Sequence, residues 1–136
     1  MKIRSVLLPL IAVVGGSAGR LDAHHSIAGV YDSGRQVTVA GIVKEFHFVN
    51  PHPFIIVEIH PAGRDEAWKL ELDNRSELSD VGVTDQTFQP GDRVTVSGNP
   101  IRPPQSRLLY VRKLERAADG FEYEQVGNSP RIHRTR

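Results

Sequence analysis

The sequence predicts an all-β domain, a small five-stranded β-barrel with one short helix. Two observations support this fold class. Short segments rich in valine, isoleucine and aromatic residues recur between turns that contain glycine or proline, a pattern typical of strands. One segment alone, which begins at Asn74, carries the start signal of a helix. The chain has 136 residues and no cysteine, so its core must hold it together without disulfides or thiolate metal sites.

The first two strands are predicted on either side of a proline turn. Residues 37–48 form a long run rich in valine, isoleucine and phenylalanine. Gly41 lies inside this run, where we expect a bulge or a sharp bend. The segment Asn-Pro-His-Pro at 50–53 forms a rigid turn, because each proline fixes its own φ and restricts the residue before it. The second strand covers residues 54–60.

Three further strands complete the predicted barrel. In residues 68–72 a tryptophan and two leucines alternate with charged residues in a period of two, so this third strand has one buried and one wet face. The fourth strand, residues 92–98, follows a Pro-Gly turn pair. A proline-rich loop at 99–105 leads to the fifth strand at 108–114.

The single helix is predicted between the third and fourth strands. Asn74 followed three residues later by Glu77 resembles a capping box, in which the two residues satisfy free backbone N–H groups at the helix start. Gly82 can end the helix in a left-handed conformation. Leu78 and Val81 fall on one face, and we expect this face to plug one end of the barrel.

The order of three strands, a short helix and two strands is that of an OB-type five-stranded barrel. From residue 118 onward the sequence no longer has a regular strand pattern. Phe121 and Tyr123 could add a last short strand, but residues 128–136 read as a frayed basic tail. We therefore expect an OB-like domain over residues 24–118 and a flexible tail over residues 119–136.

Residues 1–23 are predicted to be an export signal. A positively charged start precedes an apolar run at 6–14, which small residues then interrupt. Two cleavage points stay open, one after Ala23 and one after Ala18. The apolar run is too short to cross the roughly 30 Å hydrocarbon core of a bilayer. We therefore expect a soluble periplasmic protein that has no stable membrane insertion once the signal is removed.

Composition and motifs favour binding over catalysis. Without residues 1–23 the 17 basic and 16 acidic residues fall to 14 and 15, so no basic footprint for nucleic acid remains. The sequence has no Gly-x-Ser-x-Gly elbow, no spacing that would assemble a catalytic triad, and no glycine-rich phosphate loop. We therefore expect a protein that is not an enzyme and that does not bind nucleic acid.

Four histidines are the candidate metal ligands. If cleavage occurs after Ala23, the mature chain begins at His24, whose free amine and imidazole can hold one metal ion. A second imidazole would complete a compact nitrogen site suited to copper. His25 is adjacent, and His47 and His52 flank the proline turn, where they can approach the same ion. The predicted site is therefore His24, His25, His47 and His52, with copper or zinc as the metal.

The same histidines have structural interpretations. His52 can donate a hydrogen bond to a turn carbonyl, as buried polar groups must find partners, and His47 can cover the barrel rim. His60 closes the second strand, and eight residues at about 3.3 Å each place it about 26 Å from His52. Those two cannot share one metal ion, and we expect His60 to face solvent.

Four segments carry a resemblance to a known family. They are His-His-Ser at 24–26, Val-Thr-Val-Ala-Gly-Ile-Val at 37–43, Val-Asn-Pro-His at 49–52, and the run from Phe88 to Gly98. Together they resemble domain-of-unknown-function family 6152, a family of small exported bacterial proteins. The resemblance covers roughly residues 24–114 and implies a periplasmic, OB-like β protein without an assigned activity. This chain departs at Ile27, where the family usually has an aromatic residue.

Three functions of different classes remain open. The first is a metal-binding or metal-handling protein that uses the N-terminal histidines with His52. The second is a metal-free module whose barrel face or rim engages a small ligand or another envelope protein. The third is a haem or electron-carrier accessory, for which the sequence has no clear ligation motif. We take the exported OB-like binding protein with a histidine metal site as the prediction.

Overall fold

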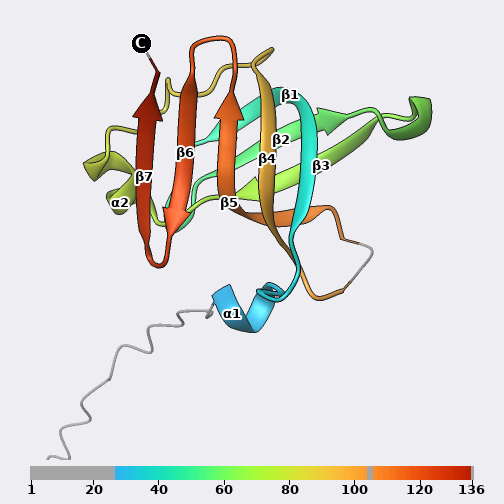
Figure 1. Ribbon diagram of the computed structural model, residues 1–136, viewed down its shortest axis with the longest axis horizontal. Helices are drawn as coiled ribbons and strands as arrows, with labels where there is room; N and C mark the ends of the chain where they lie inside the picture. Colours follow the sequence, from blue (N-terminus) through green and yellow to red (C-terminus); the bar gives the residue numbers. More distant parts are fainter. Residues whose placement is uncertain (1–26, 104–105, 136) are drawn as a thin grey trace, which may run out of the picture.

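The chain folds as a closed five-stranded barrel that is extended by two further strands (Figure 1). The computed structural model describes residues 27–103 and 106–135. Within them the elements in chain order are α1 (Ile27–Val30), β1 (Val37–His47), β2 (Phe54–Ile59), the 3₁₀ turn η1 (Pro61–Gly63), β3 (Glu66–Glu71), α2 (Arg75–Asp80), β4 (Arg93–Pro100), β5 (Leu108–Arg116), β6 (Phe121–Val126) and β7 (Ser129–Arg134). The predicted all-β class and the OB-like five-stranded barrel are confirmed.

The barrel closes through one parallel strand pair. The strand order is β3-β2-β1-β4-β5-β6-β7, and each neighbouring pair is antiparallel. The parallel pair joins β3 to β5, from Lys69 opposite Leu108 to Glu71 opposite Tyr110. Closure leaves β1 to β5 without a free edge, and the hairpin of β6 and β7 extends the sheet from β5. β7 is the outer strand of this extension (Figure 1).

Strand β1 pairs with two neighbouring strands, and its register shift does not lie at Gly41. Its first half pairs with β4 and its second half with β2. The register shift falls between Val43 and Glu45, so of the bulge or sharp bend predicted at Gly41 the bulge is wrong. A Cβ at Gly41 would lie 2.6 Å from the carbonyl oxygen of Glu58. The glycine therefore permits close approach of two strands, which is the other common reason for glycine in a strand.

The core consists of inward-facing residues of the barrel strands. Its fully buried members include Val43, Ile55, Val57, Leu70, Val96 and Leu114. The alternation predicted for the third strand is confirmed, because Leu70 and Leu72 are buried and Trp68 packs against the core while partly exposed. Burial of this apolar surface is the main source of stability in a chain without disulfides.

Helix α2 begins and ends as the sequence predicts. The Oδ1 atom of Asn74 accepts a hydrogen bond from the backbone N–H of Glu77 at 2.9 Å. Gly82 has φ of 93°, the left-handed conformation that ends a helix. Leu78 is fully buried in the core, and Val81 packs against it. In residues 27–103 and 106–135 no helix is long and apolar enough to cross a membrane.

The flexible tail predicted over residues 119–136 is wrong for residues 121–134, which form β6 and β7. Phe121 and Tyr123 are 0% and 1% exposed, so this hairpin belongs to the core. The alternation of apolar and polar residues in β6 is a strand signal that its acidic residues obscured. Gly127, with φ of 61°, begins the two-residue turn, as glycine does in tight hairpins.

The single turn of α1 was not predicted. The backbone N–H of Tyr31 donates to the carbonyl of Ile27 at 2.8 Å, and that of Asp32 donates to the carbonyl of Pro100 at 2.8 Å. Tyr31 also forms an isolated bridge with Ile101. These bonds fix α1 against the end of β4.

Candidate functional site

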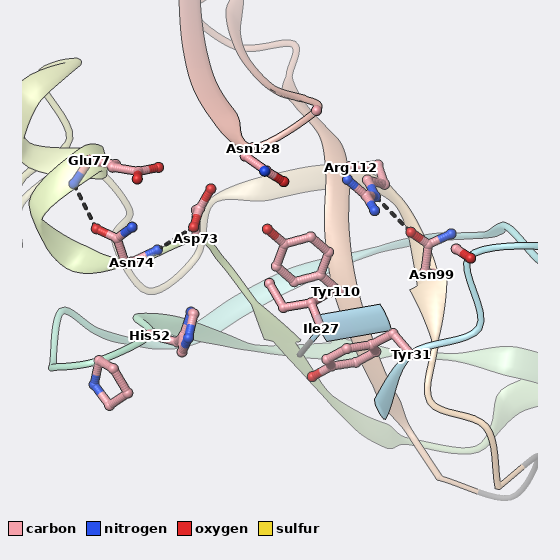
Figure 2. Close-up of a pocket in the computed structure, with 13 residues that line it drawn as sticks. Ile27, Tyr31, His52, Asp73, Asn74, Glu77, Asn99, Tyr110, Arg112 and Asn128 are labelled. Carbon is pink, nitrogen blue, oxygen red and sulfur yellow. Dashed lines mark hydrogen bonds between the residues drawn. The ribbon is translucent and has the colours of Figure 1, made fainter. Parts of the chain in front are cut away.

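A cavity of about 500 Å³ lies where α1, the start of α2 and the β6–β7 turn converge (Figure 2). Its volume falls in the range of small-molecule sites. The lining residues are Ile27, Tyr31, Ser33, Pro51, His52, Asp73, Asn74, Glu77, Asn99, Tyr110, Arg112, Gly127 and Asn128. Sequence reasoning identified only His52 among them as a candidate site residue, because the others come together only in the folded chain.

Asp73 forms one buried part of the cavity wall. It is 7% exposed, and its Oδ1 accepts a hydrogen bond from the backbone N–H of Asn74 at 2.7 Å. Its Oδ2 accepts from the side-chain amide of Gln125, whose Oε1 in turn accepts from the Tyr123 hydroxyl at 2.7 Å. The carboxylate is therefore held from two sides, and strand β6 takes part in positioning it.

Glu77 adds a second carboxylate to the same wall (Figure 2). In a complete capping box its side chain would accept a hydrogen bond from the backbone N–H of Asn74. That N–H is bonded to Asp73 instead, so only half of the predicted box forms. The Oε2 atom of Glu77 is buried and has no hydrogen-bond partner among the residues that the structure describes. An unpaired buried polar atom is costly, and more so when it is charged.

The opposite wall carries a cation (Figure 2). The Nε–H of Arg112 donates to Oδ1 of Asn99 at 2.6 Å, and the guanidinium lies 5.0 Å from the centre of the Tyr110 ring. Asn99 is 6% exposed, and its amide donates to the carbonyl of Arg35 at 2.7 Å. Arg112 is thus held by an amide and an aromatic face.

Two tyrosines provide the aromatic surface of the cavity. Their ring centres are 5.6 Å apart with a 40° tilt. The Tyr31 hydroxyl donates to Oε2 of Glu71 at 2.5 Å. Burial raises the pKa of Tyr31, and the bond to Glu71 raises it further. Burial also raises the pKa of Tyr110, with a second contribution from the charge of Asp73. Both hydroxyls therefore keep their protons at neutral pH and remain hydrogen-bond donors.

His52 reaches the cavity from the loop before β2. Its Nδ1 lies 3.3 Å from the carbonyl oxygen of Leu72 and 3.9 Å from Oε1 of Glu71. The loop is fixed to the start of α2, because the backbone N–H of Arg75 donates to the carbonyl of Pro51 at 3.0 Å. The peptide bond before Pro51 is cis. With Nδ1 directed at a carbonyl, Nε2 is the nitrogen that remains for a ligand.

The other predicted ligands are placed differently. His47 lies on the exposed side of β1, where its ring stacks on Phe54 at 4.4 Å and its Nε2 is 2.6 Å from Oε2 of Glu45. It is not among the residues that line the cavity. His24 and His25 lie outside the described residues.

A second group that could hold a metal ion lies at the end of the β2–β3 hairpin. Ligand atoms of Glu58, His60 and Asp65 all lie within 4.8 Å of one another. Nδ1 of His60 is 2.7 Å from Oδ1 of Asp65. His60 is exposed, as expected, but sequence reasoning missed the group because Asp65 joins it only through the hairpin. Lys44 lies 3.4 Å from Glu58 and pairs with the same carboxylate.

Comparison with known proteins gives a family but no activity. No curated protein matches the chain in sequence. Among solved structures the chain is similar to Rim1, the mitochondrial single-stranded DNA-binding protein of S. cerevisiae. The sequence identity is 11%, the match covers 61% of this chain and 92% of that one, and the TM-score is 0.45. Residues 12–108 match the family of unknown function DUF6152. The resemblance found in the sequence is therefore confirmed, and the chain belongs to the family of unknown function DUF6152.

Proposed function

We propose that the protein is an exported periplasmic binding protein whose cavity binds a copper ion through His24, His25 and His52. One observation carries this proposal. Ile27, which lines the cavity together with His52, is separated from the two N-terminal histidines only by Ser26. The segment that holds the predicted terminal ligands is therefore joined directly to the wall that holds the third imidazole.

The covalent reach of the chain supports the same arrangement. Consecutive α-carbons are 3.8 Å apart, so that of His25 lies at most about 8 Å from that of Ile27, and that of His24 at most about 11 Å. This length of chain joins both imidazoles to the cavity that Ile27 and His52 line together.

The chemistry of the donors favours copper over zinc. Cleavage after Ala23 gives His24 a free amine, and this amine, its imidazole and Nε2 of His52 are three nitrogen donors. Divalent copper binds such nitrogen sites more tightly than zinc does in the usual order of affinities. Asp73 and Glu77 add negative charge beside the ion and offset its charge.

Copper titration of the processed, metal-free protein tests this function. We expect His24→Ala and His52→Ala each to weaken copper affinity at least tenfold, because each removes a nitrogen donor. Acetylation of the terminal amine should do the same. His47→Ala is the matched control and should not change affinity, because His47 does not line the cavity. Unchanged affinity in both the His24 and the His52 variants would remove the proposal.

A metal-free binding module is the second candidate, and the size of the cavity favours it. A space of about 500 Å³ lined by two tyrosines, Asn99 and Arg112 can hold an organic molecule as well as an ion. The carboxylates of Asp73 and Glu77 would repel a phosphate backbone, which supports the expectation that nucleic acid is not the ligand. Native mass spectrometry of protein from the periplasm separates these candidates, since it reports bound metal and bound organic ligand in one spectrum.

A further inference from the structure

We propose that the cavity binds a small zwitterion of the ω-amino acid type, with its ammonium group at Glu77 and Asp73 and its carboxylate at Arg112. The inference rests on the second candidate function, the metal-free binding module, and gives that module a chemical class of ligand. It does not require the copper site. Three features of the cavity carry it: an acidic wall, a cationic wall, and the fixed separation between them.

The acidic wall, formed by Asp73 and Glu77, lacks a hydrogen-bond donor. The Asn74 side chain already accepts from the backbone N–H of Glu77, and Asp73 already accepts from the backbone N–H of Asn74. The Glu77 carboxylate is therefore not needed to cap α2. Its Oε2 is buried without a partner in the described part of the chain, beside an aspartate that is only 7% exposed. A ligand with several N–H donors on one nitrogen would satisfy this wall, and an ammonium group has three.

The cationic wall is the guanidinium of Arg112. Its Nε–H donates to Asn99, and its plane lies over the ring of Tyr110. Among residues 27–103 and 106–135 its two terminal nitrogens make no hydrogen bond. A guanidinium whose terminal nitrogens are available presents parallel donors that match the two oxygens of a carboxylate. This wall therefore suits an anionic group at the other end of the ligand.

The two walls do not neutralise each other. Within the part of the chain that the structure describes, no ion pair joins Arg112 to Asp73 or Glu77. Figure 2 shows them on opposite sides of Tyr110. Burial raises the pKa of Tyr110, the charge of Asp73 raises it further, and the charge of Arg112 opposes the shift, so both walls act on the same hydroxyl. The hydrogen bonds that hold Asp73 and Arg112 keep the opposite charges apart.

This separation selects the type of ligand. A simple amine would leave Arg112 without an anion, and a simple carboxylate would leave Glu77 without a donor. An α-amino acid carries both charges on one carbon and cannot serve two opposite walls together. An ω-amino acid has its charges at its two ends, and its methylene groups can lie against the apolar lining of Ile27, Tyr31 and Tyr110. Because the walls are already held in place, the ligand does not have to order them.

Calorimetric titration of the processed, metal-free protein tests the inference. The probes are γ-aminobutyrate, δ-aminovalerate and ε-aminocaproate, each compared with the fatty acid, the alkylamine and the α-amino isomer of the same chain length. We expect the best of the three ω-amino acids to bind about tenfold more tightly than each of its matched compounds, because each of these loses one of the two charge-assisted contacts.

Two variants assign the ends of the ligand. Glu77→Gln should remove the preference for the ω-amino acid over the fatty acid, and Arg112→Gln should remove the preference over the alkylamine. Asp80→Asn and Lys113→Gln make the same changes of net charge at exposed positions and should alter neither preference. Glu77→Gln keeps the backbone cap, and the amide of Arg112→Gln can still donate to Asn99, so both variants should fold. Circular dichroism would verify this, and Glu77→Gln tests the inference alone if the other variant unfolds.

The inference is overturned if none of the three ω-amino acids binds, if the α-amino isomers bind as tightly, or if the preferences survive in Glu77→Gln. These results are distinct from failure of the proposed functions. Weak copper binding together with tight binding of an ω-amino acid would remove the metal site alone. An organic ligand found by native mass spectrometry that lacks either end group would retain the binding module and reject this class of ligand.

Discussion

Deletion of residues 119–136 is expected to unfold the protein rather than trim a tail. The deletion removes β6 and β7, and with them the fully buried side chains of Phe121 and Tyr123. Phe121 packs edge-on against Phe88, with ring centres 5.5 Å apart. Loss of the β6–β7 hairpin would also expose the edge of β5 that now pairs with β6. A domain of this size has a total stability of only about 5–15 kcal/mol, which these losses exceed or exhaust.

The substitution Phe121→Ala measures part of this effect in a full-length chain. Truncation of a buried phenylalanine costs about 3–5 kcal/mol, from the lost transfer free energy and the cavity left behind. Val126→Ala in the same strand is the control, because Val126 is 41% exposed and its loss should change stability by less than about 0.5 kcal/mol. Urea unfolding followed by Trp68 fluorescence gives both values. Equal stability of the two variants would show that the hairpin is not part of the core.

Stability is expected to fall steeply above pH 10. All 3 tyrosines of the chain are buried, and burial is the largest cause that raises the pKa of Tyr31, Tyr110 and Tyr123. A group whose pKa is raised by folding contributes its full stability below the unfolded pKa, about 10 for tyrosine, and loses it as the pH rises toward the folded value. The unfolded chain then releases protons that the folded chain keeps. Each tyrosine lowers the free energy of unfolding by about 1.4 kcal/mol per pH unit in this range.

Urea unfolding at intervals between pH 9 and about 11 would measure this slope, with tyrosinate absorbance recorded on the same samples. Tyr110→Phe removes one of the three ionising groups and should lower the slope by about one third. The tyrosinate signal should appear together with loss of structure. Tyrosinate that forms in the folded protein near pH 10 would contradict the assignment of these hydroxyls as buried.

The barrel was predictable from the local sequence, because each of its strands is a short periodic segment with turn residues on either side. The helix was predictable for the same reason, since Asn74, Glu77 and Gly82 lie within nine residues. The β6–β7 hairpin has equally local signals in its alternation and in Gly127, but its many acidic and basic residues are also typical of a flexible tail. The bulge near Lys44 has no such signal, because strand register depends on the partner strand.

The site was far less predictable than the fold. His52 was identified because it adjoins a distinctive turn. The sequence predicts Glu77 only as part of a helix cap, a role that describes its backbone neighbours and not the cavity it lines. His47 shows that closeness in the sequence can also mislead. It lies five residues from His52, but the pairing of β1 with β2 places it opposite Phe54, with which it stacks.

The walls of the cavity come from residues as far apart in the chain as Ile27 and Asn128. No partial structure can assemble them, so the cavity exists only in the complete fold, and an organic occupant held by these walls binds the native state alone. Mass action then links occupancy to global unfolding, and a ligand at one hundred times its dissociation constant adds about 2.7 kcal/mol to the free energy of unfolding. The melting temperature of this small domain is thus a direct assay for an organic ligand of the cavity.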